Sequence, residues 1–364
     1  MARLRVAVIG VGHLGKEHAR ILAGLPEVEL IGVADVNVDQ ARAVARRLGC
    51  RAYSNHRPLL HLTDAAVIAA PTIHHYNLAG EFLRCGIPLL VEKPLAATVE
   101  EADNLVELAR QHHTLLQVGH IERFNPAWEE LQRYSFQPKF IECSRFGPFT
   151  GRSFDIGVVL DLMIHDLDLL LALNQAPLHS VAALGVSVFG GHEDIANARL
   201  TFANGCVANV TASRASYVTQ RRLQIWAPEG YARVDFAERH LTFVQPSDLL
   251  RRHGLDPRTL GPASRAMLKE ELFERYLQVL QRDCDASGDQ LTRELEDFIR
   301  CVQRGSRPRV TGEDGRTAVA LAWQILQSIN SHCWSGSAGG PTGPSELPLP
   351  CGAFFRPAAR DVAA

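Results

Sequence analysis

The chain is poor in lysine, and it lacks paired cysteines and long apolar runs. Only four lysines occur, at positions 16, 93, 139 and 269, among 38 lysines and arginines. Because arginine is used at most positions that need only a positive charge, a lysine at a conformationally restricted position indicates a specific role. The basic residues are balanced by 40 acidic ones, which leaves a formal net charge of −2. This balance creates no basic field, so we expect no nucleic-acid partner.

The eight cysteines are scattered singly, without a CxxC pair. In a chain of 364 residues this pattern predicts reduced thiols rather than a disulfide framework or a zinc cage. The longest uncharged run, residues 169–192, carries Asn174, Gln175 and Pro177 near its middle, so it cannot span a bilayer. The apolar stretch after Arg3 and Arg5 is too short for a signal peptide. We therefore expect a cytoplasmic protein without membrane contact.

The first 120 residues alternate short apolar runs with helical patterns. Runs of strand length cover Leu4–Ile9, Val28–Ala34, Ala65–Ala70, Ile87–Val91 and Leu115–Gly119. Helical stretches begin near Leu14 and Asp39 and follow the next two runs. Continuous apolar strands separated by helices predict a parallel sheet that is covered on both faces. At 364 residues the chain is long enough for a second domain.

The pattern changes after Gly119. We predict a helix over about Leu160–Leu173, strands over Val181–Phe189, Asp194–Phe202, Val207–Ser213, Leu223–Ala227 and Ala232–Phe236, and helices over Ser264–Arg282, Leu291–Arg304 and Arg316–Cys333. Asn204-Gly205 is a strong hairpin signal between two of these strands. Residues 121–334 should thus form an α+β domain with a largely antiparallel open sheet. Residues 335–364 are rich in Gly, Pro, Ser and Ala, which predicts a disordered tail.

A glycine-rich loop directly follows the first predicted strand and opens the first helix. Gly10 permits the tight turn, Gly12 lets a pyrophosphate approach the main chain, and Gly15 allows close packing of the helix. This context predicts a dinucleotide-binding Rossmann domain over residues 1–120, with His13 and Leu14 also at the cofactor. A tight turn without a ligand is the alternative.

Asp35 ends the second predicted strand, where its carboxylate can accept both ribose hydroxyls of the cofactor and repel a 2′-phosphate. We therefore expect NAD as the cofactor. The alternative for Asp35 is an ordinary capping role at the turn.

Two further turns lie at the predicted carboxyl edge of this sheet. Glu92-Lys93-Pro94 follows the fourth strand, and its rigidly held ammonium could bond a substrate hydroxyl; a salt bridge to Glu92 is equally plausible. Pro71, Thr72 and His75 follow the third strand and are candidates for contact with the cofactor. A histidine without a role at a helix entry is about as plausible for His75.

The helix over Leu160–Leu173 carries Asp161, His165 and Asp168 at a spacing that places them on one face. A carboxylate one turn from an imidazole can orient it and raise its basicity, which makes a proton acceptor near neutral pH. A solvated polar stripe and a metal site are the alternatives. No further ligand motif accompanies the group, and we expect no metal.

Together these motifs resemble the glucose–fructose oxidoreductase / inositol dehydrogenase (Gfo/Idh/MocA) family, over about Leu4 to Cys333. The similarity includes Glu193-Asp194 and the Thr311–Gly315 segment. It implies an NAD(P)-dependent oxidoreductase in which Lys93 binds the reacting hydroxyl while Asp161 and His165 accept the proton. Glu92 and Lys93 would also touch the cofactor. Some relatives are non-catalytic ligand-sensing proteins with degraded motifs, which is one alternative function here; oxidation of another sugar or a cyclitol such as myo-inositol is another.

A narrower similarity involves Val118–Pro126 and Pro148–Arg152, together with the Leu160–Asp168 segment. These resemble the bacterial branch that oxidises the 3-hydroxyl of UDP-N-acetylglucosamine, in amino-sugar synthesis for lipid A. For such a substrate Arg123 and Arg152 are candidate diphosphate partners, since the guanidinium fork matches phosphate oxygens. Surface solvation is the alternative for both arginines. The family also implies a homo-oligomer, a dimer or tetramer that associates through the open sheet.

Overall fold

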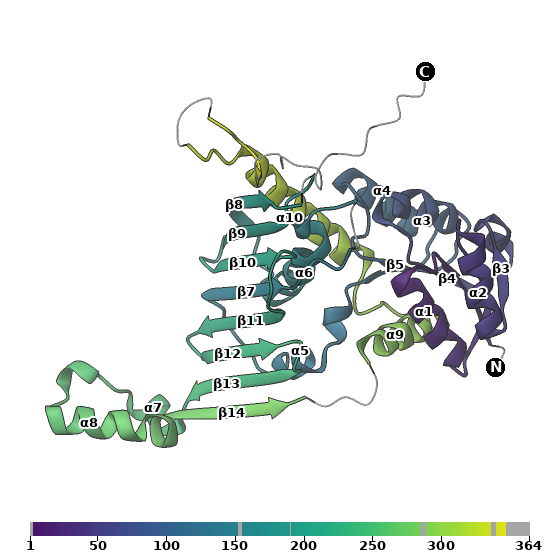
Figure 1. The fold of residues 1–364 in the computed structure, drawn as a ribbon. Coiled ribbons are helices and arrows are strands. Elements are labelled where there is room, and N and C mark those ends of the chain that lie inside the picture. The colour runs from purple at the N-terminus through teal and green to yellow at the C-terminus, as the bar shows by residue number, and fades with distance from the viewer. Residues whose placement is uncertain (1–2, 152–154, 190, 285–288, 336–339, 347–364) are drawn as a thin grey trace.

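The computed structural model describes residues 3–151, 155–189, 191–284, 289–335 and 340–346. Two sheets with their helices lie side by side (Figure 1). Among the described residues, no helix is long and apolar enough to cross a membrane.

The first sheet has six parallel strands in the order β3-β2-β1-β4-β5-β6. Its strands are β1 (Leu4–Ile9), β2 (Val28–Ala34), β3 (Arg51–Tyr53), β4 (Ala65–Ile68), β5 (Leu89–Glu92) and β6 (Leu116–Gly119). The helices α1 (His13–Gly24), α2 (Val38–Leu48), α3 (His75–Arg84) and α4 (Val99–Gln111) connect them. All residues of β4, β5 and β6 are buried, as a sheet covered on both faces requires. The predicted Rossmann architecture is confirmed.

The second sheet has nine strands in the order β14-β13-β12-β11-β7-β10-β9-β8-β15. They are β7 (Phe140–Phe146), β8 (Leu178–Ser187), β9 (Ile195–Phe202), β10 (Val207–Ser213), β11 (Gln220–Ala227), β12 (Gly230–Asp235), β13 (His240–Pro246), β14 (Leu277–Asp283) and β15 (Ser345–Glu346). Neighbours are antiparallel except β7–β10 and β8–β15. The hairpin between β9 and β10 turns at Asn204-Gly205 as predicted, with Gly205 at φ +80°.

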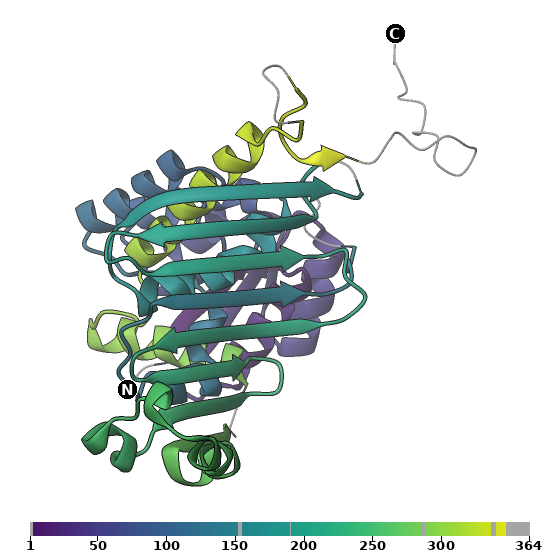
Figure 2. The same cartoon turned by 90° about the vertical axis from the view of Figure 1, so that its left-hand side faces the viewer.

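The helices of the second domain lie on one face of its sheet. α6 (Ile164–Leu173) and α10 (Gly312–Ser331) pack on this face, and α10 also contacts α4 of the first domain. In Figure 2 the other face of the sheet is turned toward the viewer, without helices across its centre. The short helix α5 (Pro126–Leu131) contacts β12 and β13, while α7 (Asp248–His253) and α8 (Pro262–Glu271) project from the β13–β14 edge (Figure 1).

Several second-domain predictions were wrong or incomplete. The helix predicted over Ser264–Arg282 ends early: α8 passes into a π-helical turn at Leu272–Tyr276 and then into β14. β14 pairs antiparallel with β13 along its whole length, so pairing with a distant segment overrides the local helical pattern. Two strands were not predicted: β7, which forms the centre of the sheet, and β13.

Two C-terminal segments pack in places that differ from the predicted domain boundaries. α9 (Gln290–Arg304) falls within the predicted second domain, yet Leu295, Phe298 and Ile299 pack into the core of the first domain beside α1 (Figure 1). In the predicted disordered tail, residues 340–346 are ordered against the body, because Ser345–Glu346 pairs in parallel with β8. Residues 336–339 and 347–364 lie outside the described residues.

Candidate active site at the carboxyl edge of the first sheet

The glycine loop after β1 has the geometry that a dinucleotide requires. Gly10 has φ +84°, and a side chain there would meet the main chain of Ala69 at 2.7 Å. A side chain on Gly15 would collide with the carbonyl of Gly10. At Gly12, in contrast, nothing lies within 4 Å of the space that a side chain would take. The loop is therefore closed toward the protein and open toward a ligand, which fits a pyrophosphate at the N-terminus of α1.

Asp35 lies at the end of β2 and is tied to this loop. Its carboxylate accepts the main-chain N–H of Val11 at 2.8 Å and that of Asn37 at 2.8 Å. The capping role weighed as an alternative is therefore real. Each carboxylate oxygen has more than one acceptor site, so these bonds leave Asp35 able to accept ribose hydroxyls as well.

Lys93 meets Asp161 across the crevice between the two domains. Its Nζ donates to the carboxylate of Asp161 at 3.0 Å and to the main-chain oxygen of Asp161 at 2.7 Å. The alternative salt bridge between Lys93 and Glu92 is wrong, because Glu92 instead bonds His18 at 2.7 Å and accepts the main-chain N–H of Lys93. The ammonium is thus aimed away from its neighbour and into the crevice.

His165 lies in the same crevice, but Asp161 does not hold it. No hydrogen bond joins the two side chains among those of the described residues; the Asp161 carboxylate is engaged by Lys93. The Nδ1 atom of His165 is enclosed and bonds no residue that the structure describes, so Nε2 is the nitrogen that a ligand in the crevice would meet. Burial, followed by the positive charges of Lys93 and Arg145, holds the pKa of His165 well below its usual range. The expectation that a carboxylate raises its basicity is therefore wrong, and the imidazole is neutral at neutral pH.

The predicted helix face fails because its first turn is not α-helical. Asp161 lies in a π-helical turn, Val159–Met163, which precedes α6. The wider turn changes which side chains align, so the i, i+4, i+7 spacing does not describe this segment. Asp168 is buried and binds Arg123 through both oxygens, at 2.6 and 2.8 Å. Neither a solvated stripe nor a diphosphate partner is found here: the Arg123 fork is occupied by an internal carboxylate.

The other predicted contacts divide between the crevice and its support. Gly12, His13, Leu14, Pro71, Thr72, Glu92 and Lys93 line the crevice. His75 does not line it. Its ring is 1% exposed and lies between the carbonyl oxygens of Pro94 and Ala70, both at 2.8 Å, so it braces two loops rather than meeting a cofactor directly. Arg152 lies outside the described residues.

Three arginines at the crevice were not found from the sequence. Arg145 on β7 binds both oxygens of Asp166, at 3.0 and 2.9 Å, and Glu122 at 2.8 Å. Arg214 binds Asp194 at 2.6 Å, and its guanidinium lies 5.2 Å from the ring centroid of Phe149. Arg221 on β11 is exposed, and no hydrogen bond or ion pair of its side chain occurs within the described part of the chain. Nothing in an arginine-rich sequence distinguishes these three.

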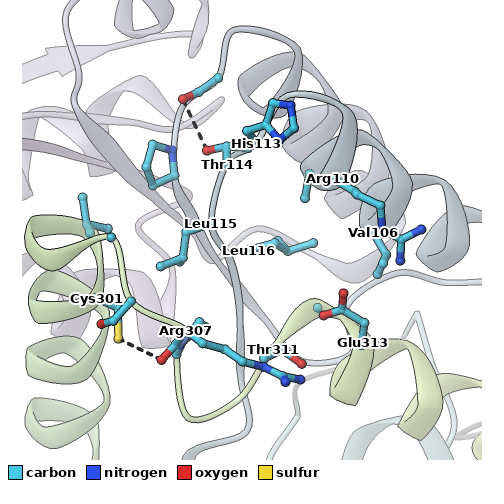
Figure 3. Close-up of a pocket in the computed structure, with 18 residues that line it drawn as sticks. Val106, Arg110, His113, Thr114, Leu115, Leu116, Cys301, Arg307, Thr311 and Glu313 are labelled. Carbon is cyan, nitrogen blue, oxygen red and sulfur yellow. Dashed lines mark hydrogen bonds between the residues drawn. The ribbon is translucent and has the colours of Figure 1, made fainter.

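The crevice has nearly the same volume as a second cavity. It encloses about 740 Å³ between the glycine loop, the ends of β5 and β6, and the second domain. The other, of about 750 Å³, lies at the opposite ends of the same strands, with Pro88, Leu115 and Leu116 in its wall. Figure 3 shows its polar groups mostly at the rim, with Arg110 and Glu313 on one side and Arg307 on another. Among the described residues, no three His, Cys, Asp or Glu side chains are placed to hold a metal ion.

Comparison with protein families matches both domains. Residues 4–120 match the model of the oxidoreductase family with an NAD-binding Rossmann fold, and residues 138–233 match the GFO/IDH/MocA C-terminal domain. The chain belongs to the Gfo/Idh/MocA family of oxidoreductases. Its cofactor is NAD, and the open space at Gly12 and the acceptor sites of Asp35 fit that group.

Individual relatives sharpen this assignment. A UDP-N-acetylglucosamine 3-dehydrogenase of Acidithiobacillus ferrooxidans is 36% identical over 91% of this chain and 99% of its own. Its solved structure superposes with a TM-score of 0.78 at 35% identity, over 90% of this chain and 98% of that one. A myo-inositol 2-dehydrogenase of Thermotoga maritima is 24% identical over 90% of this chain and 96% of its own. This family member is therefore a dehydrogenase that acts on a hydroxyl group.

Proposed function

We propose that the protein oxidises the 3-hydroxyl of UDP-N-acetylglucosamine to the 3-keto sugar. The observation that carries the proposal is the crevice, in which Lys93, Asp161 and His165 face a wall with Arg145, Arg214 and Arg221. A neutral sugar or cyclitol needs no exposed guanidinium group at the crevice, such as that of Arg221, whereas a diphosphate does. The similarity to the Acidithiobacillus ferrooxidans enzyme supports the same substrate.

Within this function each group has a defined task. His165, neutral because it is buried beside Lys93, accepts the hydroxyl proton at Nε2. Lys93, held by Asp161, stabilises the charge that develops on the oxygen. NAD, when bound, takes the hydride from the same carbon. A purely ligand-sensing role would not require an ammonium and an imidazole to converge on one point.

Arg221 is the group we assign to the diphosphate. Arg145 and Arg214 are neutralised by buried carboxylates, so they shape the wall, whereas Arg221 is exposed at the crevice with its fork available. A charge-assisted hydrogen bond is worth roughly 1.5–3 kcal/mol, which corresponds to tenfold or more in KM. The assignment thus has a measurable consequence.

The experiment measures NADH formation with UDP-N-acetylglucosamine, free N-acetylglucosamine and myo-inositol. We expect turnover with the sugar nucleotide alone, and Arg221→Gln should raise its KM while leaving that of NAD unchanged. The matched control is Arg222→Gln, because the neighbouring side chain lies on the other face of β11 and bonds Asp235 at 3.0 Å. Turnover of myo-inositol at equal efficiency would contradict the proposal.

We also propose that the protein is a cytoplasmic homo-oligomer. Phe140, Trp226 and Tyr231 form ring contacts on the open face of the second sheet, with centroids 5.0 and 5.4 Å apart, and a second copy would cover them. Six of the described cysteines form no disulfide, at positions 50, 85, 143, 206, 284 and 301, as suits a reducing compartment. Light scattering should give a dimer or tetramer, and Trp226→Glu should shift it toward the monomer. A monomeric wild-type protein would contradict the proposed homo-oligomer. Recovery of the protein outside the cytoplasm would contradict the proposed location.

A further inference from the structure

Two histidines, one at the crevice and one behind it, have buried ring nitrogens that bond no described residue. Both nitrogens of His120 and the Nδ1 of His165 lie below the surface, and no described residue forms a hydrogen bond with them. A buried polar atom without a partner is costly, so such a group is retained for a reason. His120 is 1% exposed and does not line the crevice, so a substrate does not reach its ring nitrogens.

The fold holds His120 against the helix that carries His165. His120 follows β6, and Arg123, one short turn later, grips Asp168 on α6. Asp168 is three residues beyond His165, which places the two on neighbouring positions of the helix surface. The turn after β6 is thereby fixed beside the buried side of His165.

The charges around the two rings differ. His165 is faced by Lys93, Arg145, Arg221 and His120, all of which disfavour its protonated form. Burial lowers the pKa of His120, against the opposing charges of Asp168 and Glu92, so its ring is neutral and keeps a lone pair. Asp161, the carboxylate that could have served His165, is bound to Lys93. His120 is therefore left as a neutral hydrogen-bond acceptor for the buried side of His165.

We propose that His120 is a positioning residue that fixes the tautomer of His165. The Nδ1–H of His165 is donated to one buried water that in turn bonds a ring nitrogen of His120, and Nε2 keeps its lone pair toward the crevice. When a substrate hydroxyl gives its proton to Nε2, the O–H bond breaks, an N–H bond forms, and the Nδ1 proton moves toward His120. This step relies on the proposed function only in that His165 receives a hydroxyl proton.

The first test observes the tautomer directly. In protein labelled with ¹⁵N-histidine, the imidazole nitrogens of His165, assigned by their loss in His165→Ala, should show the proton on Nδ1 at neutral pH. A proton on Nε2 in the wild-type protein would overturn the proposal. This measurement needs no substrate, so an error in the assigned sugar would leave its result intact.

The second test compares two variants of nearly equal shape. His120→Met removes every nitrogen, whereas His120→Gln keeps an amide that can accept and donate. We expect His120→Met to lose at least about tenfold in kcat and to mix the tautomers of His165, because the Nδ1–H loses its acceptor. His120→Gln should restore part of each property.

The KM for NAD and the melting temperature serve as structural readouts for both variants. His112→Phe, at the end of α4, is the matched control and should change nothing. A kcat within twofold of wild type and an unchanged tautomer in His120→Met would show that the buried imidazole serves packing alone. If His120→Met does not fold, the wild-type tautomer and His120→Gln decide the question.

Discussion

The crevice and the second cavity have nearly the same volume, about 740 and 750 Å³, and lie at opposite ends of the same parallel strands. At the carboxyl ends, Lys93, Asp161 and His165 converge from two domains, and charged side chains are buried behind them. At the amino ends (Figure 3), the polar groups bond locally: Thr114 donates to the carbonyl of Gly86, and Cys301 to that of Arg307. Volume alone does not mark a functional site. Convergence of polar groups at the carboxyl edge does.

The largest expected effect is that of Lys93→Met. We expect it to lower kcat by roughly 10²- to 10⁴-fold, because the ammonium that stabilises the oxygen charge is lost. NAD affinity should stay nearly intact. The matched change in the other cavity, Arg307→Met, removes an exposed cation there and should leave kcat unaltered. If the two variants behave alike, the contrast between the cavities fails.

His165→Ala sharpens the contrast through pH. Because burial and Lys93 hold the pKa of His165 well below the usual value of about 6.5, wild-type kcat/KM should stay level through neutral pH and fall only in clearly acidic solution, where the imidazole becomes protonated. The variant should lose that limb together with roughly 10²- to 10⁴-fold in rate. Rate measurements across the pH range decide the matter, with His112→Ala as the control. An acidic limb that persists in the variant would assign the base to another group.

Cofactor choice probes the outer end of the crevice. Asp35 would place a carboxylate beside the 2′-phosphate of NADP, and residues 36–38 contain no arginine to receive that phosphate. At surface separations this repulsion is worth about 1–4 kcal/mol, so NAD should bind at least roughly fivefold more tightly. Calorimetric titration with both cofactors tests this. Equal or tighter binding of NADP would show that Asp35 only caps the main-chain N–H groups and does not select the cofactor.

The smallest effect concerns Glu294 on α9, the helix whose first residues line the crevice and whose last residues line the other cavity. Burial, followed by the charges of Glu92 and Asp297, raises the pKa of Glu294 well above its ordinary value of about 4.3. The folded chain then holds a proton that the unfolded chain releases, so stability falls as pH rises above that value. Glu294→Gln should raise the melting temperature, and more at about pH 8 than at about pH 5.

The control for this change is Glu296→Gln, since Glu296 is exposed on the same helix. A gain in melting temperature that is equal at both pH values would mean that Glu294 is not protonated in the folded state.

The sequence predicted the elements whose signals are local. Unbroken apolar strands and the Gly10–Gly15 loop define the first sheet and its ligand edge, and Lys93 was found because a rigid turn follows a buried strand. β14 was not predicted, because its strand conformation comes from pairing with β13 rather than from the local hydrophobic pattern of its own residues. The partner of Asp161 was misjudged because a π-helical turn is invisible in residue spacing. Arg145, Arg214 and Arg221 acquire their roles only through contacts between distant segments.

α9 has a consequence for how the protein is made. Leu295, Phe298 and Ile299 complete a core that otherwise comes from residues synthesised much earlier, among them Val8 and Leu22. A nascent chain that has emerged as far as Gly119 therefore exposes the apolar flank of α1 until α9 has been translated, after most of the second domain. The ribosome delivers the last piece of the first domain near the end of synthesis, so the two domains mature together. An exchange of N-terminal halves between relatives would have to carry residues 290–304 along.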